Sequence, residues 1–88
     1  MAILVDTPRW PAHGRLWAHL VSDDNLTELH EVARLQGLPP RGFDLDHYDV
    51  PEEIVDRLIS AGARPVTARE LVVALRDSGL RVRGRDRH

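Results

Sequence analysis

The sequence predicts a small α/β domain in which three helices cover a three- or four-stranded, largely parallel sheet, stacked in two or three layers. Short apolar runs alternate along the chain with segments whose apolar residues recur at helical spacing. The 88 residues, 42% of them hydrophobic, leave room for one core only. We therefore expect a single domain over residues 1–80 and a basic C-terminal tail at residues 81–88 that is frayed.

The first two elements are expected to be strands. Residues 2–5 form an apolar run that Asp6 and Pro8 close, which is typical of a buried strand. A break around Gly14 separates this run from a second one over residues 16–21.

From Asn25 onward the apolar period changes to that of a helix. Apolar residues recur three and four positions apart, Asn25 can cap the first turn, and Gly37 stands where the helix should stop. The spacing predicts a helix over residues 26–36. A third strand is expected near the end of residues 43–50, and a helix between two strands implies a right-handed parallel crossover.

Two further helices are expected in the second half of the chain. Pro51 is favourable at the first position of a helix, acidic residues follow it, and Gly62 marks the end of this helix. Residues 64–66 allow only a short extended stretch. Thr67 and Glu70 then match a capping box, which predicts the start of the third helix.

Composition excludes several classes of function. The chain has no cysteine, which rules out thiol catalysis and thiolate metal sites. The first twenty residues contain no signal peptide or transmembrane span, so we expect a cytoplasmic protein without a membrane partner. The net charge of −2 argues against nucleic acid as a partner, and the small core is compatible with a homodimer.

Histidines and carboxylates on the predicted strands are the candidates for chemistry. Side chains two residues apart on a strand point the same way, so Trp17 and His19 share a face, as do His47 and Asp49. His30 stands at the margin of the buried stripe of the first helix. Zinc, manganese and other first-row divalent ions accept such ligands. The candidate metal ligands are His19, His30, His47 and Asp49, and the candidate catalytic residues are Asp6, His19, His47 and Asp49.

A purely structural role for each histidine stays open. The spacing matches no compact metal motif such as H-E-x-x-H, and a histidine at a core edge can simply pack its ring and hydrogen-bond locally. A calcium loop that starts at Asp44 is excluded, because its sixth and twelfth positions hold Asp49 and Val55 in place of glycine and glutamate. Asp44 and Asp46 are expected to be solvated.

A second group of residues suits an anionic ligand. Arg9 and Arg15 flank an indole in the loop after the first strand, a composition suited to holding a phosphate or carboxylate against an aromatic wall. Asp6, Asp49 and Thr67 follow predicted strands and are expected near one carboxyl edge of the sheet. The candidate ligand-binding residues are Arg9, Arg15, Trp17, Asp23 and Thr67.

Many of these residues belong to one longer pattern. It comprises Val5-Asp6, Arg9-Trp10-Pro11, Gly14-Arg15-x-Trp17-x-His19-Leu20-x-Ser22-Asp23, Glu28-Leu29-His30, His47-Tyr48-Asp49-Val50 and Ala61-Gly62-Ala63. The pattern spans nearly the whole predicted domain and resembles domain-of-unknown-function family 4031, small proteins of actinobacteria and bacteriophages. The resemblance implies a polar signature at Asp6, Arg15, Trp17, His19, Asp23, His30, His47 and Asp49, and it implies no particular activity.

Two functions remain open at this point. In the first, a small metal-assisted phosphoester hydrolase holds zinc or manganese on the histidines, with Asp6 as ligand or base and Arg15 neutralising developing charge. In the second, a non-catalytic module binds a small anion, such as a nucleotide or sugar phosphate, through Arg15, the indoles and the helix N-terminus at Thr67. A pure interaction scaffold is a third alternative.

Overall fold

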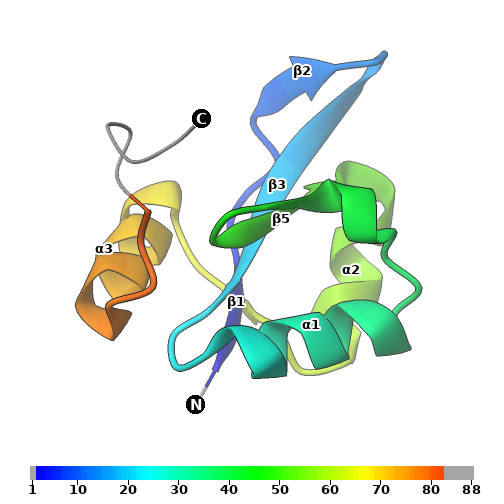
Figure 1. Ribbon diagram of the computed structural model, residues 1–88. Coiled ribbons are helices and arrows are strands. Elements are labelled where there is room, and N and C mark those ends of the chain that lie inside the picture. Colours follow the sequence, from blue (N-terminus) through cyan, green and yellow to red (C-terminus); the bar gives the residue numbers. More distant parts are fainter. Residues whose placement is uncertain (1, 83–88) are drawn as a thin grey trace.

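The computed structural model describes residues 2–82, in which one mixed sheet is flanked by helices (Figure 1). The strands are β1 (Ile3–Val5), β2 (Trp10–Ala12), β3 (Arg15–Ser22), β4 (Phe43–Asp44), β5 (His47–Pro51) and β6 (Arg64–Pro65). The helices are α1 (Leu26–Leu35), α2 (Glu52–Ser60) and α3 (Ala68–Ser78), and a 3-10 turn, η1 (Pro40–Gly42), precedes β4. The strand order is β4-β5-β3-β1-β6, and β2 also pairs with β3.

The first three strands form one long, interrupted hairpin. β1 and β2 both pair antiparallel with β3, the longest strand, and the ladder is interrupted between them, where Asp6 lies. His13 and Gly14 make the two-residue turn, with φ angles of 53° and 78°. Positive φ at both positions is what a type I′ hairpin turn requires. The loop expected between the first two strands therefore contains a strand of its own, β2.

The prediction of a largely parallel sheet is wrong. β3 pairs antiparallel with β1, β2 and β5, and β4 pairs antiparallel with β5, so that β1 and β6 form the only parallel pair in the described part of the chain. After α1 the chain enters β4 in the direction of β3, as the predicted crossover requires. A tight turn, in which Leu45 has a φ of 61°, then reverses the chain into β5. This additional reversal makes β5 antiparallel to β3.

The helices cover both faces of the sheet (Figure 1). Neighbouring residues of a strand point to opposite faces, which divides the apolar residues into two cores. The larger core, under α1 and α2, includes Val5, Leu20, Leu29, Val50 and Leu58, and the smaller core, under α3, contains Leu4, Val21, Leu71 and Leu75. Within the described range, each helix falls short of the length and apolarity that a bilayer crossing demands.

The predicted starts of the first and third helices are confirmed, whereas Pro51, predicted at the first position of the second helix, ends β5 and caps α2, which begins at Glu52. The Oδ1 atom of Asn25 accepts a hydrogen bond from the amide of Glu28 at the start of α1 (2.7 Å). At the start of α3, the Thr67 hydroxyl accepts from the Glu70 amide (3.1 Å), and the Glu70 carboxylate accepts from the Thr67 amide (2.8 Å). The capping box is therefore complete.

The predicted C-terminal tail is described only at its beginning. Residues 83–88 lie outside the described residues, so the expectation of fraying there stays a prediction. Arg81 and Val82 are described, and both lie against Asp46 in the β4–β5 turn. The start of the tail is thus in contact with the sheet.

Candidate metal centre and adjoining cleft

His19, on the central strand β3, is held by Asp6. Asp6 follows β1, and only 5% of its surface is exposed. Its Oδ1 atom accepts a hydrogen bond from the main-chain amide of His19 (2.7 Å), and its Oδ2 atom lies 2.9 Å from His19 Nδ1. A carboxylate at Nδ1 favours the proton on that nitrogen and leaves a lone pair on Nε2. Asp6 therefore fixes both the orientation and the tautomer of His19.

His47, at the start of β5, is held in the same way by Asp46. The Oδ1 atom of Asp46 lies 2.7 Å from His47 Nδ1. The Oδ2 atom of Asp46 accepts a hydrogen bond from the Val82 amide (2.7 Å) and lies 3.7 Å from the Arg81 guanidinium. Asp46 is fully buried, so the expectation that it is solvated is wrong, because the β4–β5 turn points it inward.

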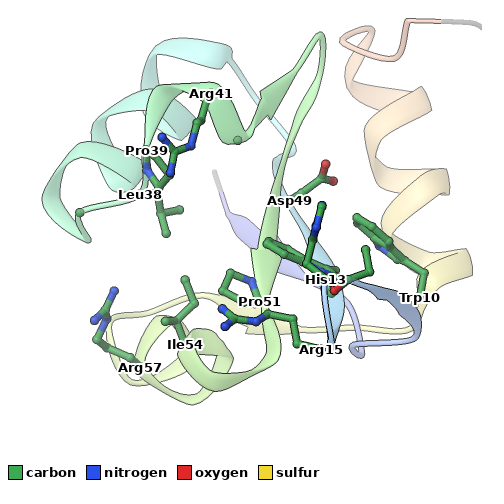
Figure 2. Close-up of a pocket in the computed structure, with 14 residues that line it drawn as sticks. Trp10, His13, Arg15, Leu38, Pro39, Arg41, Asp49, Pro51, Ile54 and Arg57 are labelled. Atoms are coloured by element: carbon green, nitrogen blue, oxygen red, sulfur yellow. Dashed lines mark hydrogen bonds between the residues drawn. The ribbon is translucent and has the colours of Figure 1, made fainter.

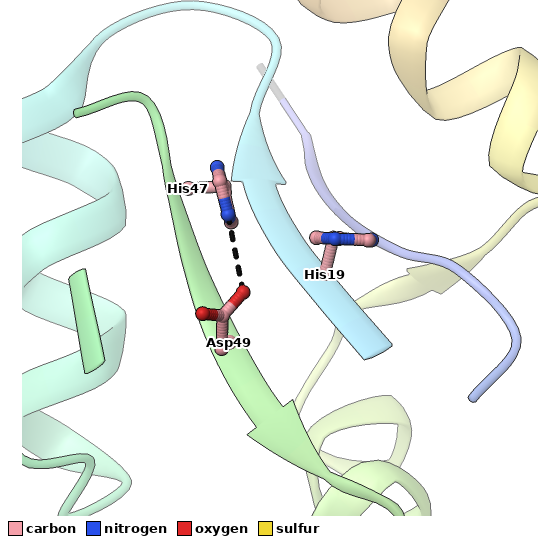
Figure 3. A group of neighbouring side chains, drawn as sticks. All are labelled: His19, His47 and Asp49. Atoms are coloured by element: carbon pink, nitrogen blue, oxygen red, sulfur yellow. Dashed lines mark ion pairs between the residues drawn. The ribbon is translucent and has the colours of Figure 1, made fainter. Parts of the chain in front are cut away.

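Both histidines meet Asp49, and we refer to His19, His47 and Asp49 as the His/Asp cluster (Figure 3). His19 is paired in register with Asp49 across β3 and β5. His47 Nε2 lies 3.1 Å from Asp49 Oδ1, and the two imidazole rings are 5.0 Å apart. One ligand atom from each residue lies within 4.8 Å of the other two. Because tetrahedral zinc separates its ligand atoms by about 3.3 Å, a small inward movement would complete a metal site.

Carboxylates predominate around the cluster in the described part of the chain. Burial lowers the pKa of His47, but its hydrogen bonds to Asp49 and Asp46 and the charges of these carboxylates outweigh burial, so its pKa lies above the ordinary 6.5. Among the described residues, the carboxylates of Asp6, Asp46 and Asp49 lie beside the two imidazoles, and the Arg81 guanidinium lies 3.7 Å from Asp46. If both imidazoles are neutral, a divalent cation would compensate the remaining negative charge.

The structure separates His30 from His19 and His47, the other two histidines among the predicted metal ligands. His30 lies on α1, with its Nδ1 atom 2.7 Å from the Tyr48 hydroxyl and its ring packed on that of Phe43 (4.6 Å). Tyr48 directly follows His47 in β5, so the two side chains point to opposite faces of the sheet. His30 therefore does not reach the His/Asp cluster.

Three predicted ligand-binding residues are not among those that line the cleft described next. The Oδ1 atom of Asp23 accepts a hydrogen bond from the Ala2 amide (2.7 Å), which ties β1 to the end of β3. The Thr67 hydroxyl is occupied in the capping box of α3. Arg9 is exposed, its amide donates to the Trp17 carbonyl, and its side chain is outside the cleft described next.

A cleft of about 710 Å³ opens beside Asp49 (Figure 2). The indoles of Trp10 and Trp17, stacked 5.7 Å apart, lie along one side, and the loop after α1 and part of α2 lie along the other. Its basic lining residues are His13, Arg15, Arg41 and Arg57. Among the lining residues Asp49 alone is acidic, so the cleft is cationic in a protein whose net charge is −2.

The three arginines of the cleft differ in how they are held. Arg15 forms an ion pair with Glu53, in which both side chains are about half exposed. Arg57 donates a hydrogen bond to the Gln36 carbonyl (2.8 Å). Arg41 has no hydrogen-bond or ion-pair partner among the described residues. Its guanidinium is therefore available to an anion without the loss of an existing contact.

The His/Asp cluster lies between this cleft and a smaller cavity of about 320 Å³ under α3. Asp49 lines the cleft, whereas His19, His47 and Asp6 line the smaller cavity together with Arg81. The cluster is thus bordered by open space on two sides.

Sequence reasoning missed Asp46, Arg81, Arg41 and Arg57. The position of Asp46 directly before a candidate ligand histidine is a signal that could have marked it as the orienting carboxylate. No local signal marks the arginines, because they come from the tail, from η1 and from α2, and only the fold brings them to the site.

A model of the family described as "Protein of unknown function (DUF4031)" matches residues 3–78. This match covers the whole His/Asp cluster and every lining residue of the cleft. The chain therefore belongs to this family, and the predicted resemblance is confirmed. Neither a curated protein nor a solved structure matches the chain.

Proposed function

We propose that this member of the DUF4031 family binds a divalent metal ion, zinc or manganese, at its His/Asp cluster and uses it to hydrolyse a phosphoester. One observation carries the proposal: each histidine is oriented by its own buried carboxylate while the ligand atoms converge with Asp49. Metal-ligating histidines almost always have such an outer partner. A histidine that only packs at a core edge needs no second carboxylate on its other side.

The number of ligands favours a catalytic centre over a structural one. Structural zinc sites are closed by four protein ligands, whereas catalytic zinc sites have three and keep a position open for water. Among residues 2–82, the His/Asp cluster offers three. A divalent ion held there would supply an activated water as nucleophile near neutral pH.

Residues of the cleft are suited to hold the phosphoester. Guanidinium groups bind phosphate oxygens through two parallel hydrogen bonds, and Arg15 and Arg41 line the cleft next to Asp49. The same groups would neutralise charge that builds up on the phosphoryl oxygens in the transition state. Hydrolysis adds water to phosphorus, breaks the bond to the ester oxygen and transfers one proton to the departing alcohol.

The cleft also favours a second function, the binding of a small anion such as a nucleotide or sugar phosphate without catalysis. Arginines and stacked indoles suffice for such binding. In that case the cluster is a set of ion pairs and hydrogen bonds, in which Asp49 and Asp46 raise the pKa of His47 above its ordinary value despite burial. Anion binding without metal binding would support this second function.

Metal content decides between the two functions. After incubation with zinc or manganese and removal of excess ion, elemental analysis is expected to find one ion per chain, with a raised Tm. His19→Ala and His47→Ala should lose the ion. His30→Gln should retain it, because His30 lies on the other face of the sheet. A wild-type protein that takes up no stoichiometric zinc or manganese, and whose Tm neither ion changes, refutes the hydrolase proposal.

A further inference from the structure

We propose that the cleft selects a mononucleotide, a phosphoester that carries a planar aromatic base. This inference rests on the proposed function, because it names the substrate class of the same site. Three features of the cleft carry it: the wall of rings, the cationic lining and the limited size.

Aromatic rings form a continuous row from the cleft to the His/Asp cluster. The centroids of Trp10 lie 5.7 Å from those of Trp17 and 6.0 Å from those of His19, and His19 is 5.0 Å from His47. Indole faces are good platforms for nucleobases, since every base has a π face. The indole N–H of Trp10 is buried and has no acceptor among the described residues. Buried donors normally have an acceptor, which a ring nitrogen or carbonyl of a base could provide after a small rotation of the indole.

The charges of the cleft place the phosphate. In Figure 2 the Asp49 carboxylate lies between Trp10 on one side and Arg41 on the other. The base of a bound nucleotide would contact the indole, and its phosphate would contact Arg41. Its phosphoester bond would therefore lie near Asp49, a member of the cluster. A sugar phosphate would use the arginine and leave the indole uncovered.

Size and overall charge favour a mononucleotide over a polymer. A cleft of about 710 Å³ is within the range of pockets for small molecules. The loop at Leu38 and Pro39 and helix α2 bound it on the side away from the indoles. A protein that coats a nucleic acid needs a basic surface along the strand, whereas this chain has a net charge of −2.

Binding is measured on the metal-free protein with adenosine 5′-monophosphate, ribose 5-phosphate and adenosine as probes. The two tryptophans of the chain both line the cleft, so their fluorescence reports its occupancy. We expect the nucleotide to quench this fluorescence and to bind about tenfold or more tightly than either fragment. Equal affinity for the nucleotide and ribose 5-phosphate, or an absence of nucleotide binding, overturns the inference. Tighter binding of an oligonucleotide than of the mononucleotide also overturns it.

Variants test which residue binds the base and which binds the phosphate, with affinities measured by calorimetry. Arg41→Ala is expected to lower the affinity for the nucleotide and for ribose 5-phosphate and to leave the affinity for adenosine unchanged. Trp10→Leu is expected to lower the affinity for the nucleotide and for adenosine but not that for ribose 5-phosphate. Trp10→Phe keeps an aromatic ring and should retain most of the affinity for the nucleotide. Arg76→Ala, at an exposed ion pair on α3 away from the cleft, is the matched arginine control and should bind all probes as the wild type does. Because Arg41 is exposed, Arg41→Ala is expected to fold, and it tests the inference even if Trp10→Leu does not fold.

The outcomes separate this inference from the proposed function. Zinc uptake that requires His19 and His47, without nucleotide binding, overturns the nucleotide assignment alone. Nucleotide binding that requires Trp10 and Arg41, without zinc or manganese uptake, overturns the hydrolase proposal alone and leaves a nucleotide-binding module.

Discussion

Replacement of Asp46 by asparagine tests the metal centre most directly. Both carboxylate oxygens of Asp46 have partners: Oδ1 faces His47 Nδ1, and Oδ2 accepts the Val82 amide and lies near the Arg81 guanidinium. Asparagine has nearly the same shape but offers one acceptor and one NH₂ group. The NH₂ group must therefore face either the Val82 N–H, as donor against donor in a fully buried position, or His47 Nδ1. That nitrogen can accept it only if the ring proton moves to Nε2, the atom that would bind the metal.

Two magnitudes follow from this geometry. Loss of an orienting partner of a ligand histidine typically weakens metal binding 10- to 100-fold, which corresponds to about 1.4–2.8 kcal/mol. Loss of the charged acceptor should also lower the free energy of unfolding of the metal-free protein by about 1–3 kcal/mol, because hydrogen bonds to a buried carboxylate are stronger than those to an amide. Zinc affinity is measured by competition with a chromophoric chelator, and stability by urea unfolding.

A pair of variants at Val82 separates loss of the hydrogen bond from loss of packing. Val82→Pro removes the amide that donates to Asp46, whereas Val82→Ala retains it. We expect Val82→Pro to weaken zinc binding and Val82→Ala to leave it within about twofold. The ¹⁵N resonances of His47 provide an independent readout: the proton should reside on Nδ1 in the zinc-bound wild type. A folded Asp46→Asn protein that binds zinc as tightly as the wild type would refute the role assigned to Asp46.

Four further predictions concern other residues. Asp6→Asn should weaken zinc binding by about 10- to 100-fold in the same competition assay, because it releases the ring of His19. Asp49→Asn should abolish zinc-dependent hydrolysis of p-nitrophenyl phosphate, a phosphomonoester, in a protein that still unfolds cooperatively. In the metal-free protein His47 should titrate above 6.5 by NMR. Because its pKa is raised on folding, its contribution to stability should be complete below about pH 6.5 and should disappear as the pH rises through the folded-state pKa, as urea unfolding across this range can show. Thr67→Ala should lower the free energy of unfolding by about 1 kcal/mol, measured with urea, and leave zinc affinity unchanged.

The helices could be predicted because their signals are local. The cap of α1 at Asn25 and the capping box of α3 at Thr67 join groups three residues apart, and the apolar stripes repeat within single segments. The direction of the strands could not be predicted in the same way. β4 and β6 have two residues each, too few to show a period, and one residue with positive φ, Leu45, reverses the chain before β5.

The candidate site, too, could be predicted only where the signal lies within one strand. The sequence by itself determined which residue types were available and which side chains shared a face within one strand, such as His47 and Asp49, because strand periodicity is a property of consecutive residues. Only the tertiary structure decided which strands are neighbours, and so which histidines meet. It paired His19 with Asp49 across β3 and β5 and left His30 on the opposite face.

The tertiary structure also decided the protonation and charge of the site. A carboxylate such as Asp46 is solvated or buried according to what covers it, and here the cover is the main chain of Val82, 36 residues further along. Likewise, the cationic cleft draws its arginines from three separate elements. Metal and anion binding depend on distances between groups that are remote in sequence, and those distances are set by the packing of the sheet and helices, which no local pattern records.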